Sequence, residues 1–120
     1  MTTRAIRGAT TLKVDERDHL HERTIELVRA ILSENGLTPD DLVSILFTAT
    51  PDISSDFPAA AARALGLGDV PLICAVEMDV QGALGLVIRV MALANLEVPR
   101  REVLHVYLHD AVSLRKDLAQ

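Results

Sequence analysis

The chain has 120 residues, a net charge of −5 and a sequence pI near 5.2. This acidic balance disfavours nucleic acid and anionic membranes as partners, because both require clustered cationic surface. Aliphatic residues must supply nearly all of the buried area, since 49% of the residues are hydrophobic and only 2% are aromatic. A chain of this length fits one domain, residues 1–120, around one core.

The cysteine content and the apolar runs indicate the compartment. Cys74 is the only cysteine of the sequence, so no internal disulfide can form and a reducing compartment is the simplest setting. The first residues lack the apolar stretch of a secretory signal, and no apolar run reaches the ~18 to 20 residues of a membrane span. We therefore expect a cytoplasmic protein.

The first half of the chain predicts two strands around a long helix. Residues 5–12 favour a strand with a bend at Gly8, and Asp15 is expected to cap a helix over residues 16–35. Apolar residues recur at helical spacing along that helix, and an Asn-Gly pair stops it. A capped single turn at residues 38–41 then leads into a second strand over residues 43–50.

The second half predicts a short helix and three more strands. Phe57-Pro58 opens an alanine-rich helix that Gly66 ends. Residues 71–78, 86–93 and 103–108 are rich in strand-forming residues, although periodicity alone leaves a helix open for 86–93. Together the elements predict an α+β domain in which one long helix and short helices pack on a five-stranded mixed sheet.

The apolar pattern of two strands implies an assembly of several copies. The strands over 43–50 and 86–93 carry apolar residues on both faces, so both faces require cover. One long helix shields only one side of a five-stranded sheet. The other side must pack on a further surface, most simply another copy of the chain.

Arginine within apolar sequence is the strongest functional signal. Arg89 lies in the run VIRVMAL, where a permanently charged guanidinium is costly to bury without an anionic partner. Arg7, Arg63 and Arg115 also stand beside apolar residues. We interpret these four arginines as candidates for an anion site.

Seven short segments, taken in order, resemble monofunctional chorismate mutases of the AroH class. Each segment is weakly specific, but the ordered set at these spacings is highly specific and spans almost the whole chain. The segments are RAIRGATT (4–11), TATPD (48–52), FPA (57–59), PLIC (71–74), EMDV (77–80), IRVM (88–91) and HVYL (105–108).

The resemblance implies both an assembly and a reaction. It implies a homotrimer with a pseudo-α/β-barrel core and active sites between neighbouring subunits. The implied reaction converts chorismate to prephenate by an intramolecular Claisen-type rearrangement, a step in the biosynthesis of phenylalanine and tyrosine. Because this chemistry needs positioning and electrostatics alone, no cofactor and no metal are expected.

The resemblance also implies roles for individual residues. Arg89 would stabilise the negative charge that gathers on the ether oxygen, and Glu77 would accept a hydrogen bond from the ring hydroxyl of the substrate. Arg7 and Tyr107 match positions that hold a substrate carboxylate. Further pocket positions are matched by Phe57, Ala59, Arg63, Ile73, Cys74, Leu114 and, in the C-terminal tail, Arg115.

Two departures and one alternative accompany this interpretation. Ala60 stands where the family pattern has a lysine, and Ile73 stands where it has a threonine. These changes bear on KM more than on the reaction, because Arg7, Glu77, Arg89 and Tyr107 are intact.

The alternative function is a catalytically silent trimeric module that binds small carboxylates. Such a module would gain nothing from pairing Arg89 with Glu77.

Overall fold

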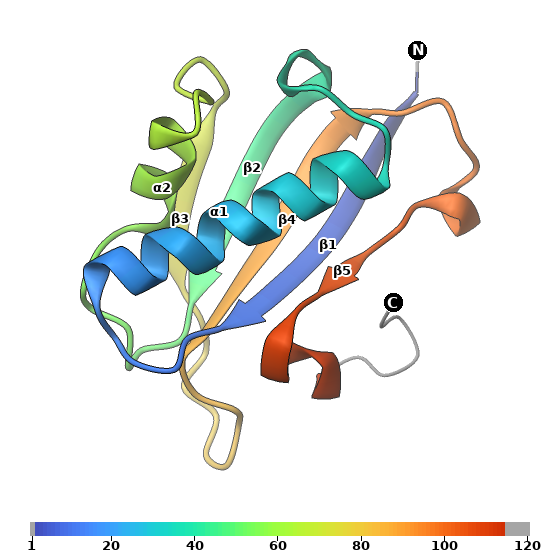
Figure 1. The fold of residues 1–120 in the computed structure, drawn as a ribbon. Helices are drawn as coiled ribbons and strands as arrows, with labels where there is room; N and C mark the ends of the chain where they lie inside the picture. Colours follow the sequence, from blue (N-terminus) through green and yellow to red (C-terminus); the bar gives the residue numbers. More distant parts are fainter. Residues whose placement is uncertain (1, 115–120) are drawn as a thin grey trace.

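The computed structural model describes residues 2–114 as a five-stranded mixed sheet with two α-helices on one side (Figure 1). The strands lie in the order β3-β2-β4-β1-β5. β4 is antiparallel to β1 and β2, whereas β5 is parallel to β1 and β3 is parallel to β2. The elements are β1 (Thr3–Thr11), α1 (Arg17–Glu34), β2 (Leu42–Ala49), α2 (Pro58–Ala64), β3 (Leu72–Val76), β4 (Val87–Asn95) and β5 (Val106–Tyr107). The predicted α+β class and mixed sheet are confirmed.

The core lies between the sheet and the two helices. Leu27 and Ile31 of α1 belong to one buried cluster with Ile6, Phe47 and Val90 from three strands. Complete burial of one such side chain stabilises the fold by about 1.5 to 3 kcal/mol. No helix within residues 2–114 is long and apolar enough to cross a membrane.

Gly8 allows α1 to approach β1 closely. A Cβ atom at this position would lie 2.7 Å from Cδ1 of Ile31 and 3.2 Å from Cδ1 of Leu27. The absence of a side chain on β1 therefore makes room for the helix. The glycine thus explains how closely α1 crosses the sheet.

The predicted cap of α1 is wrong by one residue. Glu16 is the N-cap, and its side chain accepts a hydrogen bond from the backbone N–H of Asp18 at 3.2 Å. Asp15 instead accepts the backbone N–H groups of Ser54 and Ser55 at 2.9 and 3.1 Å. The Asp15 carboxylate therefore binds backbone N–H groups of the loop before α2, and not those of the first turn of α1.

The predicted strands match the observed ones except for the last. The first four strands, the helix over 16–35 and the short alanine-rich helix all lie within two residues of their predicted bounds. The fifth strand was predicted over 103–108, but β5 contains only two residues, Val106–Tyr107. A 3-10 turn at Arg100–Glu102 precedes the strand, and His109, two residues after its end, takes a positive φ of 53°, so the pairing stays short.

The sheet face turned away from the helices is open in the single chain. Met91, Leu46 and Ile73 lie in one register row across β4, β2 and β3, with 39%, 38% and 64% of their surfaces exposed. Figure 1 shows α1 and α2 on the same side of the sheet. This row of the open side is therefore apolar, and no helix or strand among residues 2–114 covers it.

Candidate active site

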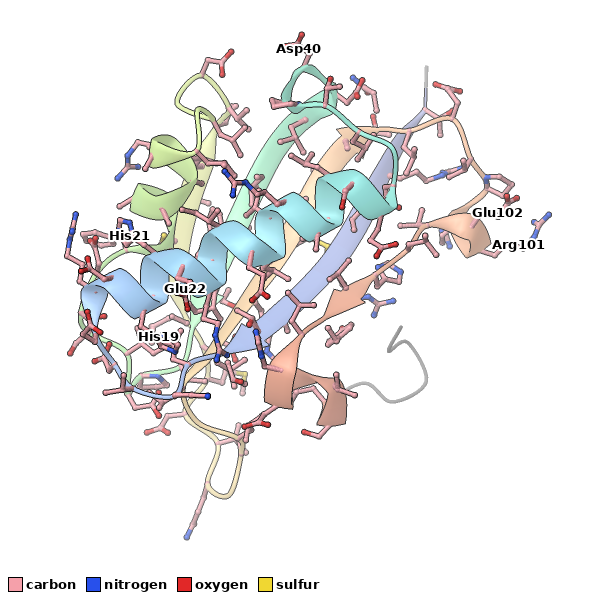
Figure 2. The ribbon with its side chains drawn as sticks, viewed as in Figure 1. His19, His21, Glu22, Asp40, Arg101 and Glu102 are labelled. Carbon is pink, nitrogen blue, oxygen red and sulfur yellow. The ribbon has the colours of Figure 1, made fainter. Side chains whose placement is uncertain are left out.

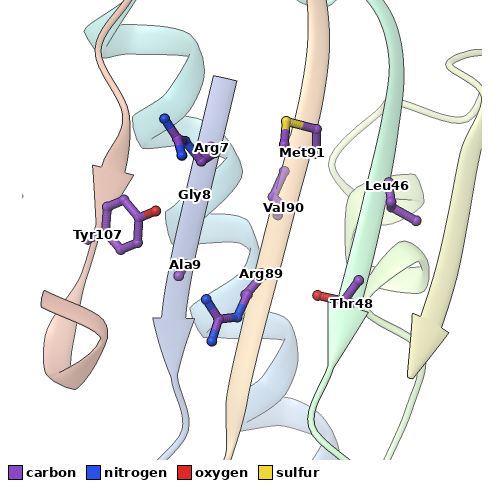
Figure 3. A pocket seen from close by; sticks show the side chains of 9 residues that line it. All are labelled: Arg7, Gly8, Ala9, Leu46, Thr48, Arg89, Val90, Met91 and Tyr107. Carbon is purple, nitrogen blue, oxygen red and sulfur yellow. The ribbon is translucent and has the colours of Figure 1, made fainter. Parts of the chain in front are cut away.

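A hollow of about 260 Å³ lies on the open face of the sheet and contains three of the predicted catalytic side chains (Figure 3). Arg7 reaches it from β1, Arg89 from β4 and Tyr107 from β5. The full lining is Arg7, Gly8, Ala9, Leu46, Thr48, Arg89, Val90, Met91 and Tyr107.

Strand register brings these side chains together. Ala9 pairs with Arg89 on one side and with Tyr107 on the other, so the three residues form one row across the sheet. Figure 3 shows Tyr107 and Arg89 on the two sides of Ala9. Because alanine ends at Cβ, space remains between the longer side chains. Arg7 precedes Ala9 by two residues and therefore points to the same face.

Glu77 is the anionic partner of Arg89. The Nε atom of Arg89 donates to Oε1 of Glu77 at 3.1 Å and lies 3.0 Å from Oε2. The Glu77 side chain is 15% exposed and the Arg89 side chain is 43% exposed. Among residues 2–114, neither Nη atom of Arg89 donates a hydrogen bond. One edge of the guanidinium is thus fixed by Glu77, and its terminal nitrogens can meet a ligand.

Arg7 offers a second cation in the same hollow. Its backbone N–H donates to Nδ1 of His105 at 2.9 Å, which ties β1 to the segment that leads into β5. Within the described part of the chain, no carboxylate forms an ion pair with the Arg7 guanidinium. Two guanidinium groups therefore line the hollow, and the one carboxylate beside them, Glu77, contacts Arg89 without lining the hollow itself, a balance that suits an anionic ligand.

A second group of predicted site residues lies elsewhere. Phe57 and Cys74 line a different hollow of about 320 Å³ between the end of β2, the start of α2 and β3. Cys74 faces the helices, where its Sγ accepts the backbone N–H of Ala59 at 3.4 Å. Ile73 points to the open face, and Arg63 is exposed on α2. Within one chain, the two groups of residues do not share a cavity.

A network of side chains holds the segment before Phe57. Asp56 accepts the backbone N–H of Phe57 at 2.7 Å, and its Oδ2 lies 2.7 Å from Nε2 of His21 and 3.3 Å from Nε of Arg17. His21 is on α1 (Figure 2). The hydrogen bond from His21, followed by that from Phe57, lowers the pKa of Asp56 below 3.8. Phe57 itself remains 67% exposed.

Sequence reasoning missed three of these contributors. Thr48 lines the Arg89 hollow and contacts Glu77, while His21 and Asp56 fix the Phe57 segment. The alternation of β2 places Thr48 on the same face as Leu46, so its position could have been read from the strand pattern. The contact between His21 and Asp56, 35 residues apart, has no local signal.

The C-terminal candidates are partly described. Leu114 packs against a small buried cluster of Ala9, Tyr107 and Ala111 and so supports the tyrosine of the hollow. Nε2 of His109 lies 2.7 Å from Oε1 of Glu26, which connects this segment to α1. Arg115 lies outside the described residues.

Comparisons with known proteins identify the family of this chain. The family model for chorismate mutase type I matches residues 3–118. The chain is 47% identical to chorismate mutase AroH of Thermus thermophilus over 116 residues, which cover 96% of this chain and 95% of that protein. It is 44% identical to chorismate mutase AroH of Bacillus subtilis over 120 residues, with coverage of 99% and 94%.

A solved structure gives the same result for the fold. A chorismate mutase from Clostridium thermocellum superposes with a TM-score of 0.89 at 41% identity, and the match covers 91% of this chain and 97% of that one. The chain therefore belongs to the type I chorismate mutase family and is an isomerase.

Proposed function

We propose that the hollow around Arg89 binds chorismate and rearranges it to prephenate in aromatic amino acid biosynthesis. The observation that carries this proposal is the pairing of Arg89 with Glu77 beside a second cation, Arg7. One site then offers a fixed cation, an acceptor for a hydroxyl group and a further cation for a carboxylate.

The chemistry of the substrate matches these three groups. Chorismate is a dianion, and its ether C–O bond lengthens in the transition state, so negative charge gathers on the ether oxygen. Arg89 stabilises that charge through its terminal nitrogens, and the effect is larger in the transition state than in the ground state. Glu77 accepts the ring hydroxyl, and Arg7 with Tyr107 holds a carboxylate.

No group has to attack the substrate or move a proton. The bond that breaks and the bond that forms both lie within chorismate, so the site acts by holding a folded conformer and by electrostatics. We therefore propose that catalysis needs no cofactor and no metal. Activity is expected to persist after treatment with EDTA, and a rate that falls with EDTA and returns with added metal would contradict this.

We further propose that the complete site forms between subunits of a homotrimer. Two observations support this: the open sheet face is apolar, and the Phe57 and Cys74 group lies in a different cavity from the Arg89 group. A neighbouring copy would bring Phe57, Ala59, Arg63, Ile73 and Cys74 to the Arg89 hollow, which Leu114 already adjoins within its own chain. Arg115 stays a proposed substrate contact. The family resemblance supports three copies.

Complementation between variants tests the shared site. Arg89→Ala and Arg63→Glu each damage a different group of residues, so each variant alone is expected to lose most of its activity. If the groups meet across subunits, co-folded mixtures contain some sites without either change and regain activity. Mixtures no more active than the separate variants would place both groups in one subunit's site.

Light scattering measures the mass of the assembly in solution. A fully active monomer would contradict the trimer.

The proposal also covers the cellular location of the protein and the extent of its domain. We propose a single chorismate mutase domain over residues 1–120 that acts in the cytoplasm, a location supported by a sequence with only one cysteine. Ala60 and Ile73 replace a cation and a hydroxyl of the family pattern, so weaker substrate capture is expected.

The ultraviolet absorbance of chorismate gives the direct test. Purified protein at micromolar concentration is expected to remove chorismate far faster than the uncatalysed background, with prephenate as the product. Loss of chorismate at the background rate would favour the silent carboxylate-binding module, which the Arg89 and Glu77 pair makes the weaker alternative.

A further inference from the structure

We infer that Thr48 is a positioning residue for this reaction, because its hydroxyl fixes the Glu77 carboxylate in the orientation that pairs with Arg89. This inference rests on the proposed function of the Arg89 hollow. Oγ1 of Thr48 donates a hydrogen bond to Oε2 of Glu77 at 2.7 Å. This distance is short, as expected for a hydroxyl donating to a charged acceptor.

The sheet places Thr48 beside Arg89, within hydrogen-bond distance of Glu77. On β2, Thr48 is the register partner of Arg89 on β4 and of Ala75 on β3. Figure 3 shows Thr48 beside Arg89 at the wall of the hollow. The hydroxyl therefore stands on a central strand, where pairing on both sides fixes its backbone.

Glu77 needs such support because it lies beyond the end of its strand. β3 ends at Val76, and the backbone of Glu77 retains one further sheet contact, from its N–H to the carbonyl oxygen of Ala49 at 2.9 Å. Its side chain has several rotatable bonds, so backbone pairing alone leaves the direction of the carboxylate open.

The two oxygens of Glu77 have different donors. Oε1 accepts from Nε of Arg89 and Oε2 accepts from Thr48. With both oxygens held, the plane of the carboxylate is defined, and so is the edge that it presents to Arg89. Without the hydroxyl, Oε2 retains only the close approach of Nε at 3.0 Å. The carboxylate can then turn, and the guanidinium can turn with it.

Thr48 does not need to touch the substrate to affect catalysis. A carboxylate that moves loses alignment with the substrate hydroxyl, and Arg89 loses alignment with the ether oxygen. Loss of a hydrogen bond to a charged group corresponds to roughly a 10- to 100-fold change. A space-filling role for Thr48 would depend on its branched shape and not on its hydroxyl.

Two substitutions separate shape from hydrogen bonding. Thr48→Val keeps the branched shape but removes the hydroxyl, and kcat is expected to fall roughly 10- to 100-fold. Thr48→Ser keeps the hydroxyl and is expected to recover kcat to within about threefold of the wild type. Thr10→Val is the matched control, because Thr10 is a fully buried β1 residue whose hydroxyl has no partner in the described chain.

A double-mutant cycle with Glu77 tests whether Thr48 acts through the carboxylate. Once Glu77→Gln has removed the charged acceptor, Thr48→Val is expected to change kcat by less than about threefold. The same loss in both backgrounds would overturn the inference, as would a Thr48→Val variant with wild-type kcat. If Thr48→Val does not fold, Thr48→Ala takes its place in the cycle, and a melting curve shows that each variant is folded.

The measurements distinguish failure of the Thr48 role from failure of the proposed chorismate mutase activity. A wild-type protein that does not convert chorismate overturns the proposed function, and the role of Thr48 with it. An active wild type whose kcat does not depend on the Thr48 hydroxyl overturns the role of Thr48 alone.

Discussion

The Arg89 hollow and the Phe57 region are built in different ways. Arg7, Arg89 and Thr48 project from strands whose register fixes their backbones, and charged groups meet there across the sheet. Phe57 instead follows an irregular segment that carboxylates tie to α1 and to the residues before it. The cationic side chains of the hollow are therefore positioned by paired strands. The position of Phe57 depends instead on side-chain contacts. Changes in the hollow should affect kcat, and changes near Phe57 should affect KM.

The largest effect is expected from Arg89→Ala. Loss of a cation directed at transition-state charge should lower kcat roughly 100- to 1000-fold. Arg89→Lys should recover little, because an ammonium group cannot contact Glu77 and the ether oxygen with the same geometry. Steady-state kinetics on chorismate measures both. Arg63→Ala should act mainly through KM, and equal small losses for both alanine variants would contradict the assignment of Arg89.

Asp56→Ala tests whether the segment before Phe57 contributes to substrate binding. The change removes the acceptor for His21, Arg17 and the backbone N–H of Phe57, so the segment loses its tie to α1. KM should rise by about three- to tenfold while kcat changes little. Asp69→Ala, at an exposed position on the loop after α2, is the control. A fall in kcat with unchanged KM would remove the distinction between the two regions.

The pH dependence of unfolding tests how much the ionised Asp56 carboxylate stabilises the fold. Its pKa is lowered by the hydrogen bonds from His21 and Phe57, so the ionised form stabilises the fold. This contribution is fully present above the ordinary value of 3.8 and is lost as the pH falls through the lower folded value. Asp56→Asn should therefore be less stable than the wild type at pH 7. Urea titrations should show the gap narrowing below about pH 4.

A smaller effect is expected from Cys74→Ala. The thiol faces α2 and accepts one long hydrogen bond from Ala59, so it acts as a contact and not as a nucleophile. The variant should keep kcat within about threefold of the wild type. Abolished turnover in a variant that melts normally would instead indicate covalent chemistry.

The smallest effect is expected from pH. kcat should stay nearly flat from about pH 6 to 9, because the arginines remain protonated and no proton moves in the reaction. A bell-shaped profile centred near neutrality would contradict this and point to His105, His109 or Cys74. The measurement uses saturating chorismate, so that binding does not enter the profile.

Much of the fold was predictable from sequence because its signals are local. The periodicity of α1, the strand-forming runs and the stops at Gly36 and Gly66 each depend on nearby residues. The fifth strand was predicted too long because its residues favour pairing, but within the described residues only Val106 and Tyr107 form ladder pairs with β1, followed by one hydrogen bond from the N–H of Leu108 to the carbonyl oxygen of Ala9. The cap was misplaced because Asp15 and Glu16 are both acidic, and a loop 39 residues away binds the first of them.

For the site, the sequence determined which groups are present, and the tertiary structure decided how they meet. The apolar run around Arg89 already required an anionic partner, and the family resemblance gave Glu77 a role at the ring hydroxyl of the substrate. Only the strand order β2-β4-β1-β5 and its register could place Thr48, Arg89, Ala9 and Tyr107 in one row. Pairing between strands depends on the burial of the whole sheet, so no local pattern specifies it. The side of the sheet on which Cys74 falls was decided in the same way, by the packing of β3 against α2.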